Sequence, residues 1–327
     1  MAGVVTSRYS LRRGKLLVSL CLLSVSWLPL QAVAERSPSF SCAEVIGQSH
    51  PATPQEWLVM SMYAGHCVDF QARAVSIDTL GVRTLALSHR IRDGVRQQVV
   101  QHLDGPSINV ERRSIAGFFA WFPSDTSEPG SSPQRWSEHV AEYYEVSQQD
   151  DTRVAERDAV ALRFSPIDSQ RYYHAWWVDK ETGLLLKQEI SDAQGRVLET
   201  FQVTQLHSPS LYSGDVVHGT DVEMPDYPWQ VSWLPEGFVE QPSERGQAQD
   251  SQRVYSDGMT AISVFAKPLS SQPLEEGVHR LGVSTAVVSQ VTFDEQRWQL
   301  IVIGELPRES LKRIANSLTF ESSALDG

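Results

Sequence analysis

The sequence Trp298-Gln299-Leu300-Ile301-Val302-Ile303-Gly304-Glu305-Leu306-Pro307, continued by Arg308-Glu309-Ser310-Leu311-Lys312-Arg313-Ile314-Ala315-Asn316-Ser317, combines a strand, a tight stop and a helix. The strand is apolar on both faces from Trp298 to Ile303, which is typical of a central strand in a sheet. In the helix, which has Pro307 in its first turn, apolar residues recur at i, i+3, i+4 and i+7, namely Leu311, Ile314, Ala315 and Leu318. This stripe must pack on the strand, so residues 231–320 are predicted to form a small α+β unit on an antiparallel sheet.

The chain upstream of this unit is dominated by short strands. From Val68 to about Leu206, apolar and polar residues alternate with a period of two, and turn signals such as Asp93-Gly94 separate the runs. Residues 172–178, 184–190 and 197–203 are predicted to form an antiparallel meander. Before the strands, Thr53-Pro54-Gln55-Glu56 has the pattern of a helix start with a capping box, and this helix is expected to end near Gly65.

Two segments lack apolar periodicity and divide the chain. Residues 123–133 are rich in turn formers and are predicted to form a mobile surface loop. Residues 207–228 contain several prolines and glycines and are predicted to be an interdomain linker. The expected organisation is a leader at 1–34, an N-terminal domain at 35–206, the linker at 207–228 and a C-terminal domain at 229–327.

The first 34 residues have the pattern of a secretory signal peptide. Four basic residues precede an apolar stretch from Leu16 to Leu30, and Ala32-Val33-Ala34 follows as a small-residue cleavage site, so cleavage is predicted after Ala34. The apolar stretch is shorter than the roughly 20 residues that span a bilayer, although an uncleaved anchor stays open as the alternative. Export from a bacterium with two membranes would place the mature protein in the periplasm.

The mature chain is strongly acidic. Loss of the leader leaves 24 Lys and Arg against 40 Asp and Glu, a net charge near −16. Such a charge argues against nonspecific binding of nucleic acid or of an anionic membrane surface.

Two cysteines, Cys42 and Cys67, stay in the mature chain, because Cys21 leaves with the leader. An even number of cysteines in an oxidising compartment suggests a disulfide, which would stabilise the fold by ~2–4 kcal/mol. Two unpaired thiols are the alternative.

The sequence contains no recognisable catalytic or metal-binding motif. None of the nine histidines has metal-ligand spacing, and neither a nucleophile elbow nor a phosphate-binding loop occurs. A hydrolase built from scattered Ser, His and Asp residues stays open, since a triad is recognised by its geometry. We predict that the protein is not an enzyme, with no catalytic residues, no metal ligands and no cofactor.

Aromatic residues cluster in the strand-rich region, as Phe118-Phe119-Ala120-Trp121-Phe122, Tyr143-Tyr144, Tyr172-Tyr173 and Trp176-Trp177. Neighbouring residues of a strand face opposite sides of the sheet, so Trp176 and Trp177 cannot both lie in one core. One face of the sheet therefore has a second apolar surface, which is either covered by helices or open as a ligand cavity.

Several motifs, in order along the chain, resemble the MucB/RseB family, whose members are periplasmic regulators of a sigma-E type (AlgU-type) envelope-stress pathway. The resemblance covers most of the mature chain and rests on Gln101-His102-Leu103-Asp104-Gly105-Pro106, Ala175-Trp176-Trp177-Val178-Asp179-Lys180-Glu181-Thr182-Gly183-Leu184-Leu185-Leu186-Lys187, Trp233-Leu234-Pro235-Glu236-Gly237-Phe238, Val254-Tyr255-Ser256-Asp257-Gly258 and residues 298–317.

The resemblance implies an α+β fold in two domains. The N-terminal domain would be LolA-like, with a strongly curved antiparallel sheet, a half-barrel, that wraps helices and encloses an apolar cavity for acyl chains. The C-terminal domain would be a smaller α+β domain on an antiparallel sheet. Candidate cavity residues are Phe70, Phe119, Trp121, Tyr144, Tyr173 and Trp176.

The resemblance also implies a function. The protein would hold the periplasmic part of a single-span anti-sigma factor of the RseA/MucA type, shield it from regulated proteolysis, and release it on binding lipopolysaccharide or another lipid-bearing ligand. Family members can self-associate, so a homo-oligomer is also implied, in a number that the sequence does not fix. Candidate exposed residues for partner contact are Tyr255, Asp257, Glu305, Arg308, Lys312 and Arg313, although a solvated helix face explains the charged ones equally well.

The alternative function rests on the N-terminal half alone. A periplasmic lipid or lipoprotein carrier of the LolA type would use the same curved sheet and cavity. It would leave the C-terminal domain without an obvious task.

Overall fold

The computed structural model describes residues 39–122, 132–217, 222–224, 226–244 and 251–320. The predicted leader at 1–34, its cleavage site after Ala34 and residues 123–131 of the predicted loop lie outside this range. Within it, no helix has the length and apolar character needed to cross a membrane.

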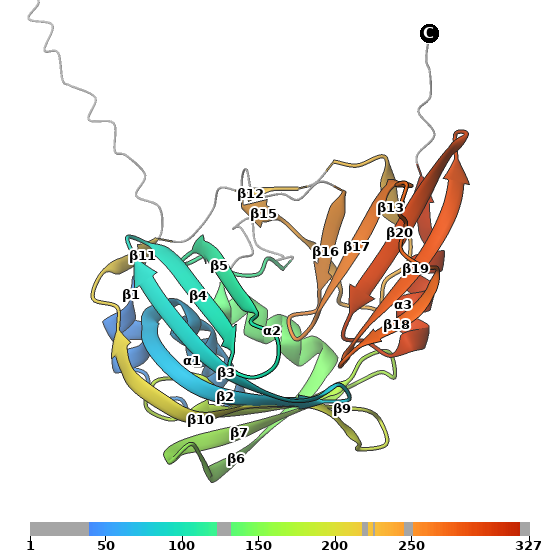
Figure 1. The fold of residues 1–327 in the computed structure, drawn as a ribbon. Coiled ribbons are helices and arrows are strands. Elements are labelled where there is room, and N and C mark those ends of the chain that lie inside the picture. The colour runs from blue at the N-terminus through green and yellow to red at the C-terminus, as the bar shows by residue number, and fades with distance from the viewer. Residues whose placement is uncertain (1–38, 123–131, 218–221, 225, 245–250, 321–327) are drawn as a thin grey trace, which may run out of the picture. The chain divides into compact units, whose positions relative to one another are not determined.

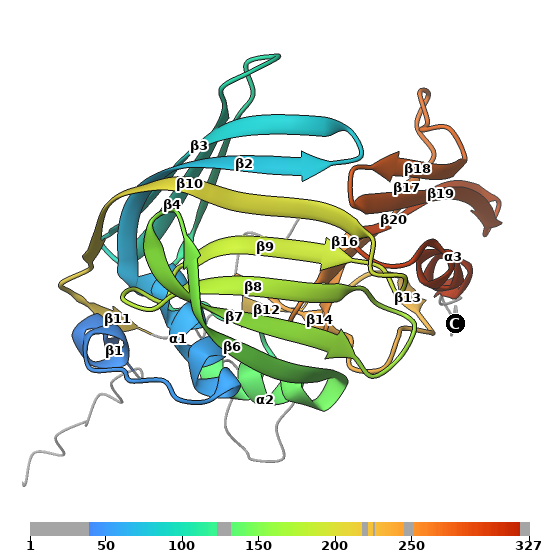
Figure 2. The same ribbon diagram turned by 90° about the horizontal axis from the view of Figure 1, so that it is seen from below.

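A nine-stranded sheet forms the N-terminal part of the described chain, with every neighbouring pair of strands antiparallel. Figure 1 shows this sheet curving around the helices α1 and α2, which lie on its inner side, and Figure 2 shows its strands from below. The predicted curved sheet of a half-barrel with few helices is confirmed. In sheet order, the strands are β5 (Asn109–Ile115), β4 (Val95–His102), β3 (Gly81–Arg92), β2 (Val68–Asp78), β10 (Val197–Leu211), β9 (Leu185–Ser191), β8 (Tyr173–Asp179), β7 (Arg157–Pro166) and β6 (Tyr144–Val154).

Two helices cover the inner face of this sheet. The helix α1 (Pro54–Cys67) begins with the predicted capping box, in which the side chains of Thr53 and Glu56 accept backbone N–H groups at the helix start, and it ends two residues beyond Gly65. The helix α2 (Pro133–Tyr143) is a difference from the sequence prediction, which places Ser132 and Pro133 in the loop. Ser132 is instead the N-cap, since its side chain accepts the N–H of Arg135.

Neighbouring residues of the central strands serve different surfaces, as the alternation predicts. Trp176 packs against the core formed by α1, α2 and the strands, whereas Trp177 packs against a smaller cluster around Ala159 and Leu186. The two tryptophans therefore lie in separate apolar environments.

A six-stranded antiparallel sheet forms the C-terminal part, with α3 (Arg308–Asn316) packed on it. The predicted central position of the strand at 298–303 is confirmed, since β20 lies between β17 and β19. Leu311, Ile314 and Ala315 of α3 share a core with Leu300 and Val302, while Leu318 lies beyond the helix end. In sheet order, the strands are β14 (Val239–Gln241), β16 (Gln252–Ser256), β17 (Ala261–Pro268), β20 (Gln296–Gly304), β19 (Ser284–Phe293) and β18 (Gly277–Leu281).

The described residues of the predicted linker include more strand than their composition suggests. β10 continues to Leu211, and a bulge between His207 and Ser210 in its pairing with β2 accommodates Pro209, which has no N–H to donate. Three short strand pairs complete the described chain: β1 (Ser39–Ser41) with β11 (Asp215–Val217), β12 (Val222–Glu223) with β15 (Ser243–Glu244), and β13 (Trp229–Val231) with β21 (Leu318–Phe320). A π-helical turn, η1 (Ala43–Gly47), follows β1. The boundaries assigned to the two domains stay predictions.

The packing of α3 generates a stability prediction. We expect Leu311→Ala to lower the free energy of unfolding by about 2–5 kcal/mol, because it removes a fully buried side chain between α3 and β20. Lys312→Ala, at the next position on the solvent side, should change it by less than about 1 kcal/mol. Urea denaturation of both variants compares the two values, and equal losses would contradict the assigned packing.

Candidate functional site

A tight turn from the C-terminal part enters the core of the N-terminal part. This turn, Asp257–Thr260, connects β16 to β17, and we call it the seam turn. Its Met259 side chain belongs to the hydrophobic core built by α1, α2 and the nine-stranded sheet. The Asp257 carboxylate accepts the N–H groups of Met259 and Thr260, at 3.0 and 2.9 Å, which fixes the shape of the turn.

The helix α2 contacts the seam turn closely. The indole N–H of Trp136 donates to the Gly258 carbonyl at 2.8 Å. Gly258 has a φ of +96°, and a Cβ atom at this position would lie 2.8 Å from a methyl carbon of Val140. Glycine thus serves both the backbone conformation and the close approach of turn and helix. One helical turn further, His139 Nε2 lies 2.8 Å from the Gly237 carbonyl oxygen.

We call the contact between the N-terminal and C-terminal parts around this turn the seam. At its centre is a buried ion pair between Arg171 and Asp257. One guanidinium nitrogen of Arg171 donates to Asp257 Oδ2 at 2.8 Å, and both side chains have 0% exposure. The Tyr144 hydroxyl donates to the same oxygen at 2.8 Å. The carboxylate therefore accepts four hydrogen bonds, counting those within its turn, which replaces the hydration that it loses on burial.

Arg171 is held from several sides. Its other terminal nitrogen donates to Asp168 at 2.9 Å and to the Glu236 carbonyl at 2.5 Å. The guanidinium carbon lies 5.4–5.5 Å from the ring centroids of Tyr143, Tyr144 and Phe238, which is cation–π distance.

Burial and charge act together on the ionisation of these groups. Burial alone would lower the pKa of Arg171, but Asp257 and the other neighbouring groups outweigh it and raise this pKa. The pKa of Tyr144 is raised by burial and by the charge of Asp257, so the phenol stays protonated and donates a hydrogen bond to Asp257. Arg171 is thus charged, and the neutral Tyr144 is a second donor to the carboxylate.

A buried histidine lies beside this ion pair. His174 is 3% exposed, its ring centroid is 6.1 Å from that of Tyr144, and neither ring nitrogen has a hydrogen-bond partner among the described residues. Burial lowers the pKa of His174 to about 4, against a weaker opposite effect of Asp257. The imidazole is therefore neutral at neutral pH.

Two pockets between the N-terminal and C-terminal parts are lined in part by predicted partner-contact residues, Glu305 in one and Arg308 in the other. One, of about 240 Å³, is lined by Gln188, Ile190, Glu199, Phe201 and Glu305. Burial raises the pKa of Glu305, and the nearby charge of Glu199 raises it further. The other pocket, of about 140 Å³, has Arg308 and Arg280 among its lining residues, with Thr79 and Tyr172 of the N-terminal part.

The predicted partner-contact residues do not form one exposed patch. Tyr255 and Asp257 are 5% and 0% exposed, so their expected exposure is wrong. Asp257 turns inward because Arg171 and Tyr144 offer it donors there, and Tyr255 packs in the C-terminal core. The other four lie at or near α3. Glu305 lines the first pocket and Arg308 lines the second. Lys312 forms an ion pair with Glu309 at 3.2 Å, and the guanidinium carbon of the exposed Arg313 lies 3.8 Å from the ring centroid of Trp233.

The predicted cavity residues also separate. Phe119 and Tyr144 are buried members of the N-terminal core, and Phe70 and Trp176 pack against it. Trp176 stacks on Trp136 with ring centroids 6.2 Å apart. Trp121 is half-buried, and its main chain exchanges two hydrogen bonds with the Gln241 side chain, at 2.9 and 3.0 Å. Tyr173 lies three residues before Trp176 on β8, so strand alternation places it on the opposite face, and these two cannot line one cavity.

Sequence reasoning missed the residues that join the two parts. Arg171, Trp136 and His139 were not singled out, and Tyr144 was assigned to a cavity. The signal available was the Asp257-Gly258 turn, a polar and flexible pair that follows a strand. Nothing local in the sequence identifies its partner, since Arg171 lies 86 residues earlier.

Comparisons with known proteins cover both parts of the chain. Residues 53–226 match the family model of the MucB/RseB N-terminal domain, and residues 223–319 match that of the MucB/RseB C-terminal domain. The chain is 26% identical over 295 residues to the sigma factor AlgU regulatory protein MucB of Pseudomonas aeruginosa, which covers 84% of this chain and 93% of that protein. It is 26% identical over 308 residues to the sigma-E factor regulatory protein RseB of Escherichia coli, with 82% and 92% covered.

Solved structures show the same extent of similarity. The complex of Pseudomonas aeruginosa MucA and MucB contains a chain that matches with a TM-score of 0.61 and 26% identity, over 83% of this chain and all of that one. A crystal structure of MucB in complex with MucA(peri) matches with a TM-score of 0.61 and 27% identity, over the same shares.

The buried ion pair generates a prediction. We expect Asp257→Asn to lower the free energy of unfolding by about 3–5 kcal/mol, because it leaves the buried Arg171 without its innermost counter-charge. Asp168→Asn is the matched control, since Asp168 contacts the same guanidinium from a position that is 24% exposed. In urea denaturation, Asp168→Asn should lower the free energy of unfolding clearly less than Asp257→Asn does. An equally large decrease would contradict the central place given to Asp257.

The buried imidazole generates a pH dependence. The pKa of His174 is about 4 in the folded protein against 6.5 for the free group, so in this window the unfolded chain binds a proton that the folded chain does not. The free energy of unfolding should therefore fall as pH decreases from 6.5 towards 4, by about 3 kcal/mol from this group.

His174→Leu should reduce this pH dependence, and His207→Gln, at an exposed histidine, is the matched control variant. Thermal or urea unfolding between pH 7 and pH 4.5 tests both variants. An unchanged pH profile in His174→Leu would contradict the assignment.

Proposed function

Since this chain belongs to the MucB/RseB family, we propose that it is a regulatory protein of the periplasm that binds the periplasmic part of a membrane anti-sigma factor of the RseA/MucA type. Through this complex it keeps a sigma-E type factor inactive. The observation that carries the proposal is that similarity to MucB, as solved in complex with MucA, extends over 83% of the chain and so over both of its parts. A carrier that needs only the curved sheet would not account for the C-terminal match.

The mechanism proposed is reversible masking. The anti-sigma segment is inaccessible to its regulated protease while it is bound, and no bond is made or broken by this chain. Lipopolysaccharide, or another lipid-bearing ligand, binds the free form better than the complex and thereby releases the segment. Such coupling is reciprocal, because a ligand that weakens partner binding must itself bind less tightly when the partner is present.

Three basic residues of α3 are proposed to contact the partner. Arg308 and Arg313 are exposed and Lys312 is partly exposed, while the mature chain as a whole carries a large negative charge. An acidic segment would be attracted to this helix and repelled elsewhere, which favours binding in one place. Tyr255 and Asp257 are left out of this contact because they are buried.

A pull-down from solubilised host membranes tests the proposal. Tagged protein that begins at Glu35 should capture a single-span anti-sigma factor, identified by mass spectrometry, and added lipopolysaccharide should lower the amount captured. The captured segment should also be cut more slowly by its protease than the free segment. Recovery of lipoproteins or lipid without an anti-sigma factor would contradict the proposal and favour the lipoprotein carrier.

Charge reversal of α3 provides the control. The variant Arg308→Glu/Lys312→Glu should weaken partner binding by roughly tenfold or more, which corresponds to about 1.4 kcal/mol. The matched variant Arg112→Glu/Arg297→Glu changes the same charge at exposed strand positions and should bind normally. Equal weakening in both variants would show that net charge, not α3, is responsible.

A further inference from the structure

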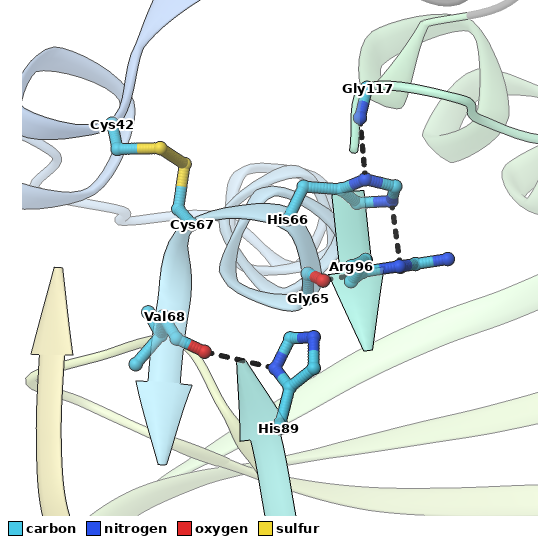
Figure 3. Close-up of a disulfide and its surroundings, with 8 residues drawn as sticks. All are labelled: Cys42, Gly65, His66, Cys67, Val68, His89, Arg96 and Gly117. Carbon is cyan, nitrogen blue, oxygen red and sulfur yellow. Dashed lines mark hydrogen bonds between the residues drawn. A yellow bond between two sulfur atoms is a disulfide. The ribbon is translucent and has the colours of Figure 1, made fainter. Parts of the chain in front are cut away.

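The disulfide between Cys42 and Cys67 lies where several distant segments meet. It joins the residue that follows β1 to the last residue of α1, and both cysteines are buried, at 1% and 0% exposure. Figure 3 shows this bond next to the end of α1, where the side chain of His66 points towards Gly117 and Arg96.

The disulfide fixes the N-terminal segment on the core. β1 pairs with β11. Ile46, four residues after Cys42 in the sequence, has its side chain buried in the core. The ring of Phe40 lies 4.8 Å from that of Tyr63 on α1 and 5.9 Å from that of Phe119. Without the covalent bond, this segment would be held by non-covalent contacts alone, among them the short β1–β11 pairing and the packing of Phe40, Val45 and Ile46.

The segment 116–122 rests on the same structure. The N–H of Gly117 donates to His66 Nδ1 at 2.9 Å, directly beside Cys67 in the sequence. Gly117 has a φ of +85°, and a Cβ atom here would collide with the carbonyl oxygen of Val217 in β11, the strand that pairs with β1. Phe119 is buried, and its ring centroid lies 5.9 Å from that of Phe40 and 4.3 Å from that of His66.

This segment continues to the C-terminal part. The main chain of Trp121 donates to Gln241 Oε1 and accepts from Gln241 Nε2, at 2.9 and 3.0 Å, and Gln241 is the last residue of β14. A continuous set of contacts thus connects the disulfide, through His66, Gly117 and Phe119, to the six-stranded sheet.

We propose that the Cys42–Cys67 bond determines whether segment 116–122 stays docked on Gln241, and that partner capture therefore depends on the oxidising capacity of the compartment in which the chain folds. The second half of this statement rests on the proposed function. Bond formation removes two protons and two electrons from the two thiols, and the acceptor is a protein or small-molecule disulfide that becomes a dithiol.

Because both cysteines are buried, their oxidation state is set while the chain folds and does not change rapidly afterwards. Thiol–disulfide exchange requires that an incoming thiolate reach one of the sulfurs, and both cysteines are enclosed by the core. A chain that folds while oxidants are scarce would thus keep its thiols, bind the anti-sigma segment weakly and leave the stress response active.

Hydrogen exchange of the full mature chain tests the conformational part without any partner. Protein folded with a glutathione redox buffer is compared with the same chain folded under a dithiol reductant, and with Cys42→Ala/Cys67→Ala. The amides of residues 116–122 should exchange at least tenfold faster in the reduced chain and in the variant. Amides of β17 and β20 serve as the internal control and should exchange equally in all three.

Each outcome is informative. Equal exchange of residues 116–122 in oxidised and reduced chains overturns the proposal, and so does a uniform increase that includes β17 and β20, because the disulfide would then act only on global stability. Partner capture by the three samples completes the test, with at least tenfold weaker binding expected without the bond. If the oxidised chain captures no anti-sigma factor, the proposed function fails, whereas equal capture by all three overturns the redox dependence alone.

Discussion

A carboxylate is removed from water only where other donors replace its hydration, and this constraint governs how the two parts of the molecule fit together. Asp257 receives its four hydrogen bonds from two sources, its own turn and the N-terminal part. The turn must enter the core of the curved sheet to reach Arg171 and Tyr144, and Met259 enters with it. Hydrophobic burial and ion pairing therefore require the same docking geometry, which makes the seam specific as well as stable.

The seam has consequences for the surfaces around it. The two pockets are formed by side chains from both parts, so their shapes depend on how these parts dock. The proposed regulation by masking requires a binding surface that is preformed in one state and altered in another. A surface shared between two sheets meets this requirement more readily than one on a single sheet, because a small shift at the seam changes both sides of the surface.

The sequence predicted the elements well where local physics determines them. The capping box at Thr53, the meander of β8, β9 and β10, and the apolar stripe of α3 on β20 are all local patterns, and the structure confirms them. The helix α2 was missed because its N-cap lies directly after a segment rich in turn formers. The extent of β10 was missed because a bulge, which depends on the neighbouring strand, accommodates Pro209.

The candidate site was less predictable for a different reason. Whether a charged residue such as Asp257 is exposed depends on what lies opposite it, and the donors opposite come from distant parts of the chain. A motif can therefore identify Asp257-Gly258 as a turn without showing which way the carboxylate points. The residues of α3 were easier to place, because the stripe that packs on β20 leaves Arg313 on the other side of the helix, and Arg308 is exposed at the helix start.

The separation of 86 residues between Arg171 and Asp257 also bears on the order in which the protein matures. A chain exported from its N-terminus presents the nine-stranded sheet first, while the charge on Arg171 and the indole N–H of Trp136 still lack the partners that the seam turn supplies. Until the later residues arrive, water must occupy that place, and the edge of the first core stays hydrated. Docking of the seam turn has to displace this water, so a chain interrupted before the seam turn would leave Arg171 and Trp136 without the acceptors that Asp257 and Gly258 provide.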